Sequence, residues 1–527
     1  MEKQPLTLRR MIHQLAEQYP DNESVVDDLY RYTYRELLDV IQRMAKLLHA
    51  KGVRKGDRVA LLVPPSSSHI IALFGAIELG AIPSALHTRE SADTLSAVVE
   101  RLSPRVLVYD GAYADKAKDL CQCSEAITAA IRTVSPVTPE AERDTGSDPV
   151  IPQDLVDYEL DFEPMPLTTE ETAVIALSSG TTGIPKGIMH RHETLLASAR
   201  NGAKYMAAHR HATTISIFST AFIGCYNTTL PFLYSGSKIV FISQWDTPRF
   251  LQTIQEEQVT VCFLVPTMWR MLLRENLEEY DLSSLERVGY AGEPMDTATM
   301  AQLRENICSS VINTYGTTET GSWGGCAVMR PDDYNKYPEK LESVGRQADG
   351  VEIRIVNPDG SVDDELPAGE EGEIIFSGPS VANQLWEQPE LSRKIFQGRW
   401  WRSGDMGVKD EAGYIFLRGR IDDMIISAGI NVLPGQVEET VLSHPAVSEC
   451  VVIGLPDEKW GEMISAFVIC EGSVTQEELE THVDQSHLSG YKKPRAYYFV
   501  DELPRGNTGK VSRKLLRERI ENTEEQS

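Results

Sequence analysis

Residues 172–187 read TAVIALSSGTTGIPKG and join an apolar run to a loop rich in glycine and hydroxyl groups. The apolar part, 172–177, predicts a short buried strand. The next ten residues, 178–187, hold four hydroxyl side chains, three glycines, one proline and one lysine. Glycine lets backbone N–H groups approach an anion, hydroxyls donate further hydrogen bonds, and Lys186 supplies a positive charge. This composition predicts a mobile loop that grips a polyphosphate.

The same stretch differs from the Walker phosphate loop. That loop needs Gly-Lys-Ser/Thr leading directly into a helix, whereas here Pro185 precedes Lys186 and Gly187 follows it. Clusters of glycine, serine and threonine are most often only surface turns. The assignment therefore depends on the rest of the chain.

The length and composition predict a multi-domain globular protein. At 527 residues the chain is too long for one ordinary core. Hydrophobic residues make up 41% and charged residues 24%, which is typical of a soluble protein. The apolar runs fall short of a membrane span, and the first residues, MEKQPLTLRRMIHQ, lack the apolar core of a signal peptide. We therefore expect a cytoplasmic protein with no transmembrane segment.

The net charge of −27 opposes binding to nucleic acid or to an anionic membrane. A polyphosphate must then be held by local lysines, arginines, amides and a metal ion. The eight cysteines are scattered, and only Cys121 and Cys123 form a close pair. This spacing favours reduced thiols over a disulfide framework or a cysteine metal site.

Helix-spaced apolar segments alternate with short apolar runs between residues 7 and 109, and again between 172 and 314. This alternation predicts an α/β fold with parallel sheets covered on both faces. The Pro-rich, acidic stretch 134–169 predicts a surface crossing between two sub-domains. After residue 350, short strands and turns predict a small β-rich sub-domain. From residue 435 onward the pattern predicts a compact α+β unit of about 100 residues.

Four further stretches combine glycine with chemically active side chains. They are Tyr315–Thr320 (YGTTET), Trp401–Asp405 (WRSGD), Gly419–Asp423 (GRIDD) followed by Ser427-Ala428-Gly429, and Leu503–Lys510 (LPRGNTGK). The first follows a predicted strand, which is where α/β proteins place ligands. There the aromatic ring can stack on a base, Thr318 can donate to a phosphate, and Glu319 is a hard oxygen ligand suited to Mg²⁺.

Each stretch alone has an ordinary structural interpretation. Asp405 and Arg420 can form a surface ion pair, Lys510 can be a solvated turn lysine, and Tyr315 can be a core aromatic. Five such motifs in a fixed order over more than 330 residues are not expected by chance.

Together the motifs resemble those of the AMP-forming acyl-CoA synthetase and ligase superfamily, whose relatives include non-ribosomal-peptide adenylation domains and luciferases. Residues 178–187 are similar to its phosphate-loop signature, and 315–319 to its Tyr-Gly-x-Thr-Glu signature. Ser403-Gly404-Asp405 stands where the family usually has Thr-Gly-Asp, and the change keeps the aspartate. Gly419-Arg420 and Gly509-Lys510 are similar to its hinge-region and C-terminal lysine motifs. The resemblance runs from about residue 10 to residue 520.

The resemblance implies a large N-terminal domain, residues 1–421, and a small mobile α+β C-terminal domain, residues 422–527, with the hinge at Asp422. The N-terminal domain would contain two doubly wound α/β sub-domains and the small β-rich one.

For the phosphates of ATP, the resemblance implies that Thr181, Thr182 and Lys186 bind the β- and γ-phosphates, Thr318 contacts the α-phosphate and Glu319 binds Mg²⁺. For the adenine, it implies that Gly292, Glu293 and Pro294 line the site and that Tyr315 stacks on the ring. For the ribose, it implies that Asp405 and Arg420 bind the hydroxyl groups. Lys510 would bridge the attacking carboxylate and the α-phosphate. Two negative groups meet in this step, so positioning and charge neutralisation would carry the catalysis.

The implied reaction has two halves. A carboxylic acid and ATP give acyl-AMP and pyrophosphate, and coenzyme A then gives the thioester. For the second half the C-terminal domain would turn about Asp422, so that Lys510 leaves and Ser427, Ala428 and Gly429 border the thiol tunnel.

The sequence is less specific about the acid. Gly316 stands where acetate-specific relatives carry tryptophan, which predicts a pocket for more than two carbons. Phe222, Ile223, Tyr290 and Trp323 are the predicted walls and favour a medium-chain fatty or aromatic acid; ordinary core packing is the alternative. A histidine that many relatives carry near Phe222 is absent. We expect His190 and His192 to be packing or capping residues, not catalytic bases.

Three alternatives remain open. A stand-alone adenylating enzyme that loads an acyl carrier protein shares every motif above. A non-catalytic nucleotide-binding relative would be expected to lose some of Lys186, Glu319, Asp405 and Lys510, which are all present. A luciferase-type oxygenase would differ in its substrate and not in a motif. The sequence also leaves a homodimer open.

Overall fold

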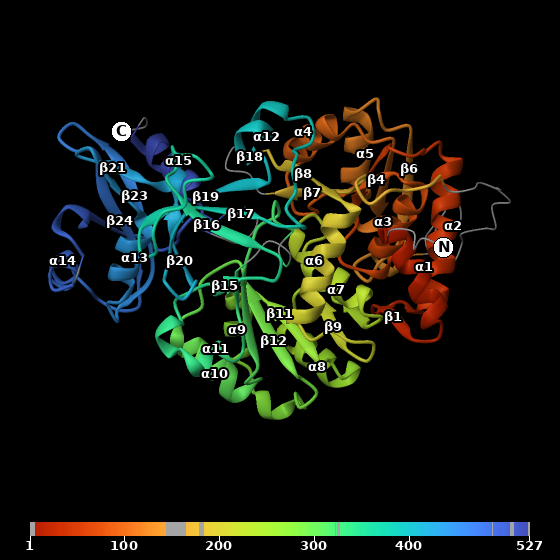
Figure 1. The fold of residues 1–527 in the computed structure, drawn as a ribbon, viewed down its shortest axis with the longest axis horizontal. Helices are drawn as coiled ribbons and strands as arrows, with labels where there is room; N and C mark the ends of the chain where they lie inside the picture. Colours follow the sequence, from red (N-terminus) through yellow and green to blue (C-terminus); the bar gives the residue numbers. More distant parts are fainter. Residues whose placement is uncertain are drawn as a thin grey trace. The chain divides into compact units, whose positions relative to one another are not determined.

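A computed structural model describes residues 6–143, 165–178, 184–321, 323, 327–486, 488–505 and 511–524. The chain divides into two compact units. The N-terminal unit comprises residues 1–353 and 376–401, and the C-terminal unit comprises residues 354–375 and 402–527. Figure 1 shows the elements of both units in sequence colours.

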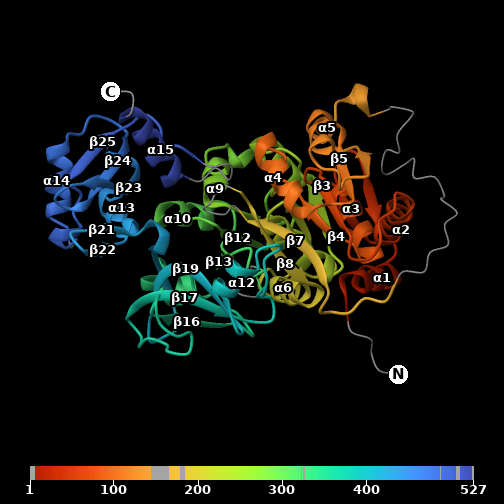
Figure 2. The same ribbon diagram turned by 90° about the horizontal axis from the view of Figure 1, so that it is seen from above.

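The N-terminal unit opens with two helices and a short hairpin, then builds a four-stranded parallel sheet in the order β4-β3-β5-β6. Every residue of α3 is buried, as expected for a helix that is apolar on all sides. Figure 2 shows this part in red to orange. Its elements are α1 (Leu8–Gln18), β1 (Glu23–Val26), β2 (Arg31–Thr33), α2 (Tyr34–Ala50), β3 (Arg58–Leu62), α3 (Ser67–Leu79), β4 (Ile82–Ala85), α4 (Ala92–Leu102), β5 (Val106–Asp110), α5 (Ala114–Cys123) and β6 (Ala129–Thr133).

A nine-stranded sheet forms the second part, in the order β15-β14-β13-β12-β11-β9-β10-β1-β2. Its inner strands are parallel, and the pairs at both edges are antiparallel. The elements are α6 (His192–Tyr205), β9 (Thr213–Ser216), α7 (Ile223–Tyr234), β10 (Lys238–Phe241), α8 (Thr247–Glu257), β11 (Val261–Leu264), α9 (Pro266–Leu272), β12 (Arg287–Ala291), α10 (Thr297–Asn306), β13 (Val311–Tyr315), β14 (Ala327–Met329), α11 (Asp333–Lys336) and β15 (Arg346–Gln347). Helices α6 and α7 lie side by side (Figure 1).

Between these two sheets in sequence lies an antiparallel hairpin of β7 (Thr172–Ser178) and β8 (Lys186–Arg191). The predicted strand at 172–177 is confirmed as β7. Ser178 pairs with Lys186, so the glycine-rich loop joins the ends of two paired strands. Its exit is therefore a strand and not a helix, which agrees with the difference from a Walker loop.

The second half of the chain contains a five-stranded sheet in the order β16-β17-β19-β18, with β20 beside β19. Its elements are β16 (Glu352–Val356), β17 (Glu371–Ser377), α12 (Pro389–Ile395), β18 (Phe396–Gln397), β19 (Trp400–Lys409) and β20 (Ile415–Arg420). The predicted small β-rich part is confirmed by this sheet.

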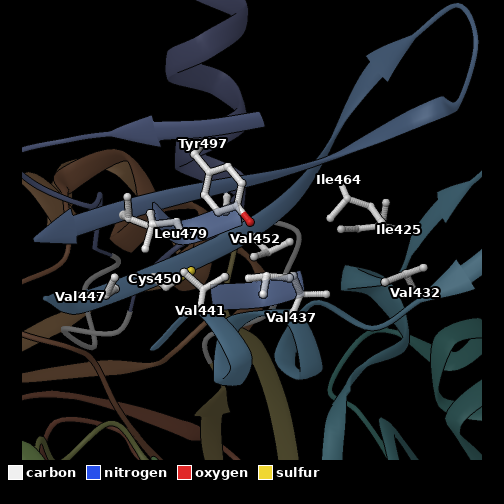
Figure 3. Close-up of a cluster of buried hydrophobic side chains, with 13 residues drawn as sticks. Ile425, Val432, Val437, Val441, Val447, Cys450, Val452, Ile464, Leu479 and Tyr497 are labelled. Carbon is white, nitrogen blue, oxygen red and sulfur yellow. The ribbon is translucent and has the colours of Figure 1, made fainter. Parts of the chain in front are cut away.

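The C-terminal residues form a separate α+β core. Its sheet runs β22-β21-β24-β23, with β25 beside β24. Figure 3 shows side chains from α13, α14, β23 and β24 gathered in one buried cluster. The elements are β21 (Ile425–Ser427), β22 (Ile430–Val432), α13 (Pro434–Leu442), β23 (Val447–Asp457), β24 (Gly461–Cys470), α14 (Gln476–Asp484), β25 (Ala496–Phe499) and α15 (Arg513–Glu524).

The predicted fold class is confirmed. Helix α9 begins at Pro266, because proline at a first helical position fixes the start of a helix. Within the described part of the chain, no helix is both long and apolar enough to cross a membrane.

Candidate active site

The exit of the phosphate loop is fixed from two directions. The backbone N–H of Trp386 donates to the Gly187 carbonyl at 2.8 Å, and its indole Nε1 donates to the Arg101 carbonyl at 2.9 Å. Arg101 Nη1 in turn donates to the Pro185 carbonyl at 3.3 Å. A Cβ atom at Gly187 would lie 2.8 Å from Ile175 Cγ2, so only glycine fits here. Lys186 therefore starts β8 from a defined position, whereas Thr181 and Thr182 lie outside the described residues.

The turn that follows β13 holds Thr318 and Glu319. Four consecutive carbonyls of this turn each accept a hydrogen bond from outside it or across it. His190 Nε2 donates to Thr318 O at 2.8 Å, Ala382 N to Glu319 O at 2.8 Å, Ser380 Oγ to Thr320 O at 2.7 Å, and Ser198 Oγ to Gly321 O. Each residue of the turn from Thr318 to Gly321 is thus held in place by a hydrogen bond to its backbone carbonyl.

His190 and His192 lie just past the phosphate loop, in the interior of the protein. Burial lowers the pKa of each imidazole to about 4, so both are neutral at physiological pH. His192 Nδ1 accepts from the Leu8 backbone N–H at 3.3 Å, and His190 fastens Thr318. These contacts agree with the predicted packing and capping roles.

The predicted adenine-site residues follow β12. Gly292 has φ of +90°, a backbone conformation that favours glycine. The Glu293 carboxylate accepts from Thr267 Oγ1 at 2.9 Å and lies 3.6 Å from Arg270. Pro294 follows directly in the chain.

The ring of Tyr315, at the end of β13, is half-buried and tilted against Phe376, with 5.7 Å between centroids. Tyr315 is thus neither a fully buried core aromatic nor a freely exposed one.

The predicted acyl-pocket residues fall into two classes. Phe222 and Ile223 are half-buried, and the Phe222 ring lies 5.0 Å from the ring of His87. Tyr290 and Trp323 are buried. The Tyr334 hydroxyl donates to the Tyr290 hydroxyl at 3.4 Å. Gly316, directly after β13, is half-buried.

Trp323 is only 1% exposed and packs between α6 and α7. Its indole Nε1 donates to the backbone carbonyl of Asn227 at 3.2 Å, and its ring lies edge-on to Phe263 at 5.5 Å. A Cβ atom at Gly202 of α6 would lie 2.5 Å from Pro231 Cγ and 2.9 Å from Trp323 Cδ1. The close approach of α6, α7 and Trp323 therefore depends on the missing side chain at residue 202.

In the C-terminal unit, Asp405 and Arg420 are register partners on β19 and β20. Arg420 Nη1 lies 2.9 Å from Asp405 Oδ1, and Asp405 is only 8% exposed. The ion-pair alternative is thus correct in part, but the carboxylate is buried and not on the surface. The Ser403 hydroxyl donates to the Ile374 carbonyl at 2.5 Å and accepts from Asp405 N at 2.9 Å. Serine therefore supplies the hydroxyl that threonine would supply at this position.

Asp422 lies in a short 3₁₀ turn, Ile421–Asp423, with its carboxylate 4.0 Å from Arg420. The next residue, Asp423, pairs with Arg513 at 3.1 Å. Ser427 ends β21, and Ala428 and Gly429 form a two-residue hairpin turn with φ of +50° and +78°. Positive φ at both turn positions is typical of a type I′ hairpin.

Sequence reasoning missed Trp460, whose carbonyl accepts from Ala428 N at 2.6 Å. The guanidinium carbon of Arg495 lies 3.5 Å from the centre of the Trp460 ring, and Lys459 Nζ lies 4.8 Å from it. A lone Trp-Gly pair in an acidic segment gives no signal, because the arginine is 35 residues away in the chain. Lys510 lies outside the described residues; the chain on either side pairs as an Arg505–Val511 bridge.

Two family models match the chain: the AMP-binding enzyme family over residues 12–386, and the AMP-binding enzyme C-terminal domain over residues 436–510. The chain is 31% identical to feruloyl-CoA synthase of an Amycolatopsis species, over 93% of this chain and 94% of the relative. It is 27% identical to the fatty acid–[acyl-carrier-protein] ligase ScoC of Streptomyces coeruleorubidus, over 96% and 95%. A solved structure of Mycobacterium tuberculosis fatty acyl CoA synthetase is similar over 98% of this chain and 99% of that chain, with 27% identity and a TM-score of 0.78.

The chain therefore belongs to the AMP-binding enzyme family. The predicted superfamily, fold class and enzyme class are confirmed: this is an AMP-forming acid–thiol ligase, which activates a carboxylic acid as acyl-AMP and passes it to a thiol.

Proposed function

We propose that this ligase acts on an aromatic or medium-chain fatty acid, uses coenzyme A as the thiol acceptor, and does so through the residues described above. The observation that carries the proposed catalytic roles is that four consecutive carbonyls in the turn of Thr318 and Glu319 all accept hydrogen bonds. A catalytic backbone held to this degree is expected where charge develops in a transition state, because preorganised groups need no rearrangement during the reaction.

In the first half-reaction, the loop residues Thr181, Thr182 and Lys186 would hold the β- and γ-phosphates. Thr318 would donate to the α-phosphate, and Lys510 would draw the attacking carboxylate onto it. Gly292, Glu293, Pro294 and Tyr315 would receive the adenine ring, and Asp405 with Arg420 the ribose diol. The carboxylate oxygen forms a bond to the α-phosphorus, and the bond from that phosphorus to the departing pyrophosphate breaks.

The proposed metal is Mg²⁺ at Glu319. Glu319 offers one carboxylate, and this fits Mg²⁺, which binds through one or two carboxylates together with substrate phosphates and water. When bound, the ion would supply positive charge beside the phosphates.

Trp460 and its two cations favour coenzyme A over a carrier protein as the acceptor. Coenzyme A carries an adenine base and several phosphates, whereas the phosphopantetheine arm of an acyl carrier protein carries one phosphodiester and no base. Trp460, Arg495 and Lys459 combine an aromatic ring with two positive charges. The backbone carbonyl of Trp460 accepts a hydrogen bond from Ala428 N, and the turn of Ala428 is the predicted border of the thiol tunnel. A carrier-protein substrate, as named for ScoC, is the alternative.

The test of the first half-reaction uses Lys510→Ala, with Lys514→Ala as the matched control because Lys514 is an exposed lysine four residues later. Loss of one well-aimed cation should lower ATP–pyrophosphate exchange by about 10²-fold or more. Conversion of synthetic acyl-AMP and coenzyme A to thioester should persist, and Lys514→Ala should change neither rate. Equal loss of both half-reactions in Lys510→Ala would contradict the proposed division of roles.

The test of the second half-reaction uses Gly429→Asn. Asparagine tolerates positive φ better than other residues, so the substitution adds bulk with little backbone strain. We expect pyrophosphate exchange to persist and thioester formation to fall. Gly413→Asn is the control, since Gly413 has φ of +83° and open space around it. Loss of exchange in Gly429→Asn, with Gly413→Asn active, would show that the tunnel role is wrong. Supplying a carrier protein in place of coenzyme A then decides the acceptor.

A further inference from the structure

One polar side chain beside the predicted acyl-pocket residues has no role in the mechanism above. Asn227 lies on α7, one helical turn after Ile223 and one turn before Pro231, so the three residues share a face of the helix. Trp323 donates to the Asn227 carbonyl, and Pro231 packs at Gly202 beside the same indole. Asn227 thus lies between Ile223 and Trp323, two of the predicted pocket walls.

Asn227 is 8% exposed, and its Oδ1 atom is buried with no hydrogen-bond partner among the residues that the structure describes. The preceding Tyr226 likewise keeps a buried hydroxyl without a partner among the described residues, but the two threonines that follow differ. Thr229 Oγ1 donates to the Cys225 carbonyl at 2.8 Å, and the Thr228 hydroxyl bonds to Ser216 Oγ at 2.8 Å. Hydroxyl side chains in a helix can donate a hydrogen bond to a backbone carbonyl of the preceding turn. The Asn227 amide oxygen has no such partner among the described residues.

A buried amide without a partner destabilises the protein, and native structures rarely keep one without a reason. Leucine has nearly the same size and would pack at this position at no such cost. A pocket for an unsubstituted hydrocarbon chain would therefore favour leucine over asparagine. The unpaired amide is explained if the substrate brings its hydrogen-bonding partner with it.

Trp323, which donates to the Asn227 carbonyl, belongs to a row of three aromatic rings. The Phe263 ring lies edge-on to both Phe218, at 6.4 Å, and Trp323, at 5.5 Å. Aromatic rings prefer such edge-on and offset contacts with further rings. A flat ring with one polar substituent matches this wall in both shape and polarity.

We infer that the acid is an aromatic acid with a hydroxyl group remote from its carboxyl group, and that Asn227 is the specificity-determining residue that pairs with this hydroxyl. The inference rests on the proposed function, because it places the substrate in the pocket of Ile223 and Trp323. A hydroxyl both donates and accepts, as a carboxamide does, so the pair forms with either orientation of the amide.

The test is ATP–pyrophosphate exchange with three acids: 4-hydroxycinnamic acid, cinnamic acid and octanoic acid. One hydrogen bond to a buried partner changes binding by about 1–3 kcal/mol, which is roughly a 5- to 150-fold effect. The unmodified enzyme should prefer 4-hydroxycinnamic acid to cinnamic acid by at least about fivefold in kcat/KM. This ratio is measured on the native protein, so it does not depend on whether a variant folds.

Asn227→Leu should reduce the ratio to about one, mainly by raising activity with cinnamic acid. Thr229→Val is the matched control, since it also removes a buried polar group from α7, one that bonds within the helix; it should keep the ratio of the native enzyme. A native ratio near one, or an unchanged ratio in Asn227→Leu, would overturn the inference while leaving the proposed function standing. Exchange with none of the three acids would overturn the substrate class proposed above.

Discussion

The turn of Thr318 and Glu319 and the face of α7 that carries Asn227 lie in the same unit but differ in how their polar groups are satisfied. In the turn, four consecutive carbonyls accept bonds from His190, Ala382, Ser380 and Ser198. On α7, the Asn227 amide oxygen has no partner among the described residues. We interpret the difference through the ligands. ATP is the same in every turnover, so its side of the site can be fixed in advance, whereas the acid side keeps a polar group for the substrate to complete.

The largest expected effect on activity comes from removing one of the hydrogen bonds that hold the turn of Thr318 and Glu319. His190→Ala removes the donor to Thr318 O and leaves a cavity beside it. A shift of about 1 Å in catalytic groups lowers rates by about 10²-fold, so we expect a loss of that order in pyrophosphate exchange. The ratio between two acids should stay unchanged, because α7 is not touched.

His192→Ala is the control for this variant. His192 is buried like His190 but accepts from Leu8 N and has no bond to the turn. Both variants should lower the unfolding temperature, and only His190→Ala should lower exchange strongly. Equal activities of the two variants would show that the fastening has no catalytic value.

A smaller effect is expected at the exit of the phosphate loop. Trp386→Phe keeps an aromatic ring but removes the indole N–H that donates to the Arg101 carbonyl. The Arg101 side chain in turn donates to the Pro185 carbonyl, so its position at the loop should loosen. One lost hydrogen bond corresponds to about 1 kcal/mol, or roughly fivefold, and should appear in KM for ATP. Conversion of synthetic acyl-AMP to thioester should not change. A change in the choice of acid would contradict the separation of the two regions.

The converse test is Trp323→Phe. It removes the donor to the Asn227 carbonyl and loosens the contact with Gly202. We expect a change of roughly fivefold in kcat/KM between a hydroxylated and an unsubstituted aromatic acid, with KM for ATP unaffected. Equal effects on ATP and on the acid would mean that the two regions are coupled.

The last effect concerns stability at low pH, and at neutral pH it leaves the activity unchanged. Burial lowers the pKa of His190 to about 4 in the folded protein, whereas an unfolded histidine titrates near 6.5. The unfolded state therefore binds the proton first as the pH falls. The contribution of His190 to the free energy of unfolding is fully present above pH 6.5. It declines between pH 6.5 and 4, by at most about 1.4 kcal/mol per pH unit.

His190→Gln should make the unfolding midpoint less sensitive to pH in that window, as measured by thermal unfolding at pH 7 and pH 5. An unchanged pH dependence would mean that His190 is protonated or exposed in the folded protein.

The parts of the fold that could be predicted from the sequence are those with local signals. Apolar runs gave β7 and β13, and glycine with proline marked the loop and the turn that follow them. β8 was hidden because its sequence, KGIMHR, begins with lysine and glycine and contains two further basic or titratable residues. α7 was hidden because Pro231 lies inside it, and proline normally interrupts a helix.

The fastening of the turn could not be predicted, for a different reason. His190, Ser198, Ser380 and Ala382 are ordinary residue types, and the first two lie more than 120 positions from the carbonyls that they bind. Only the tertiary structure brings them together. The same holds for Trp460 and Arg495, whose contact depends on the pairing of β24 with β25. Thr181, Thr182 and Lys510 lie outside the described residues, and their roles remain predictions from the resemblance.

The packing of Gly202 against Pro231 and Trp323 has a consequence for evolution within the family. Because a Cβ atom at residue 202 would overlap both neighbours, an alanine there requires a smaller residue at 323 or at 231. Substitutions at the three positions should therefore be correlated among relatives. A relative that keeps glycine at 202 and tryptophan at 323 is expected to have an acyl pocket as deep as that of this enzyme. A relative that changes both residues is expected to accept acids of a different length.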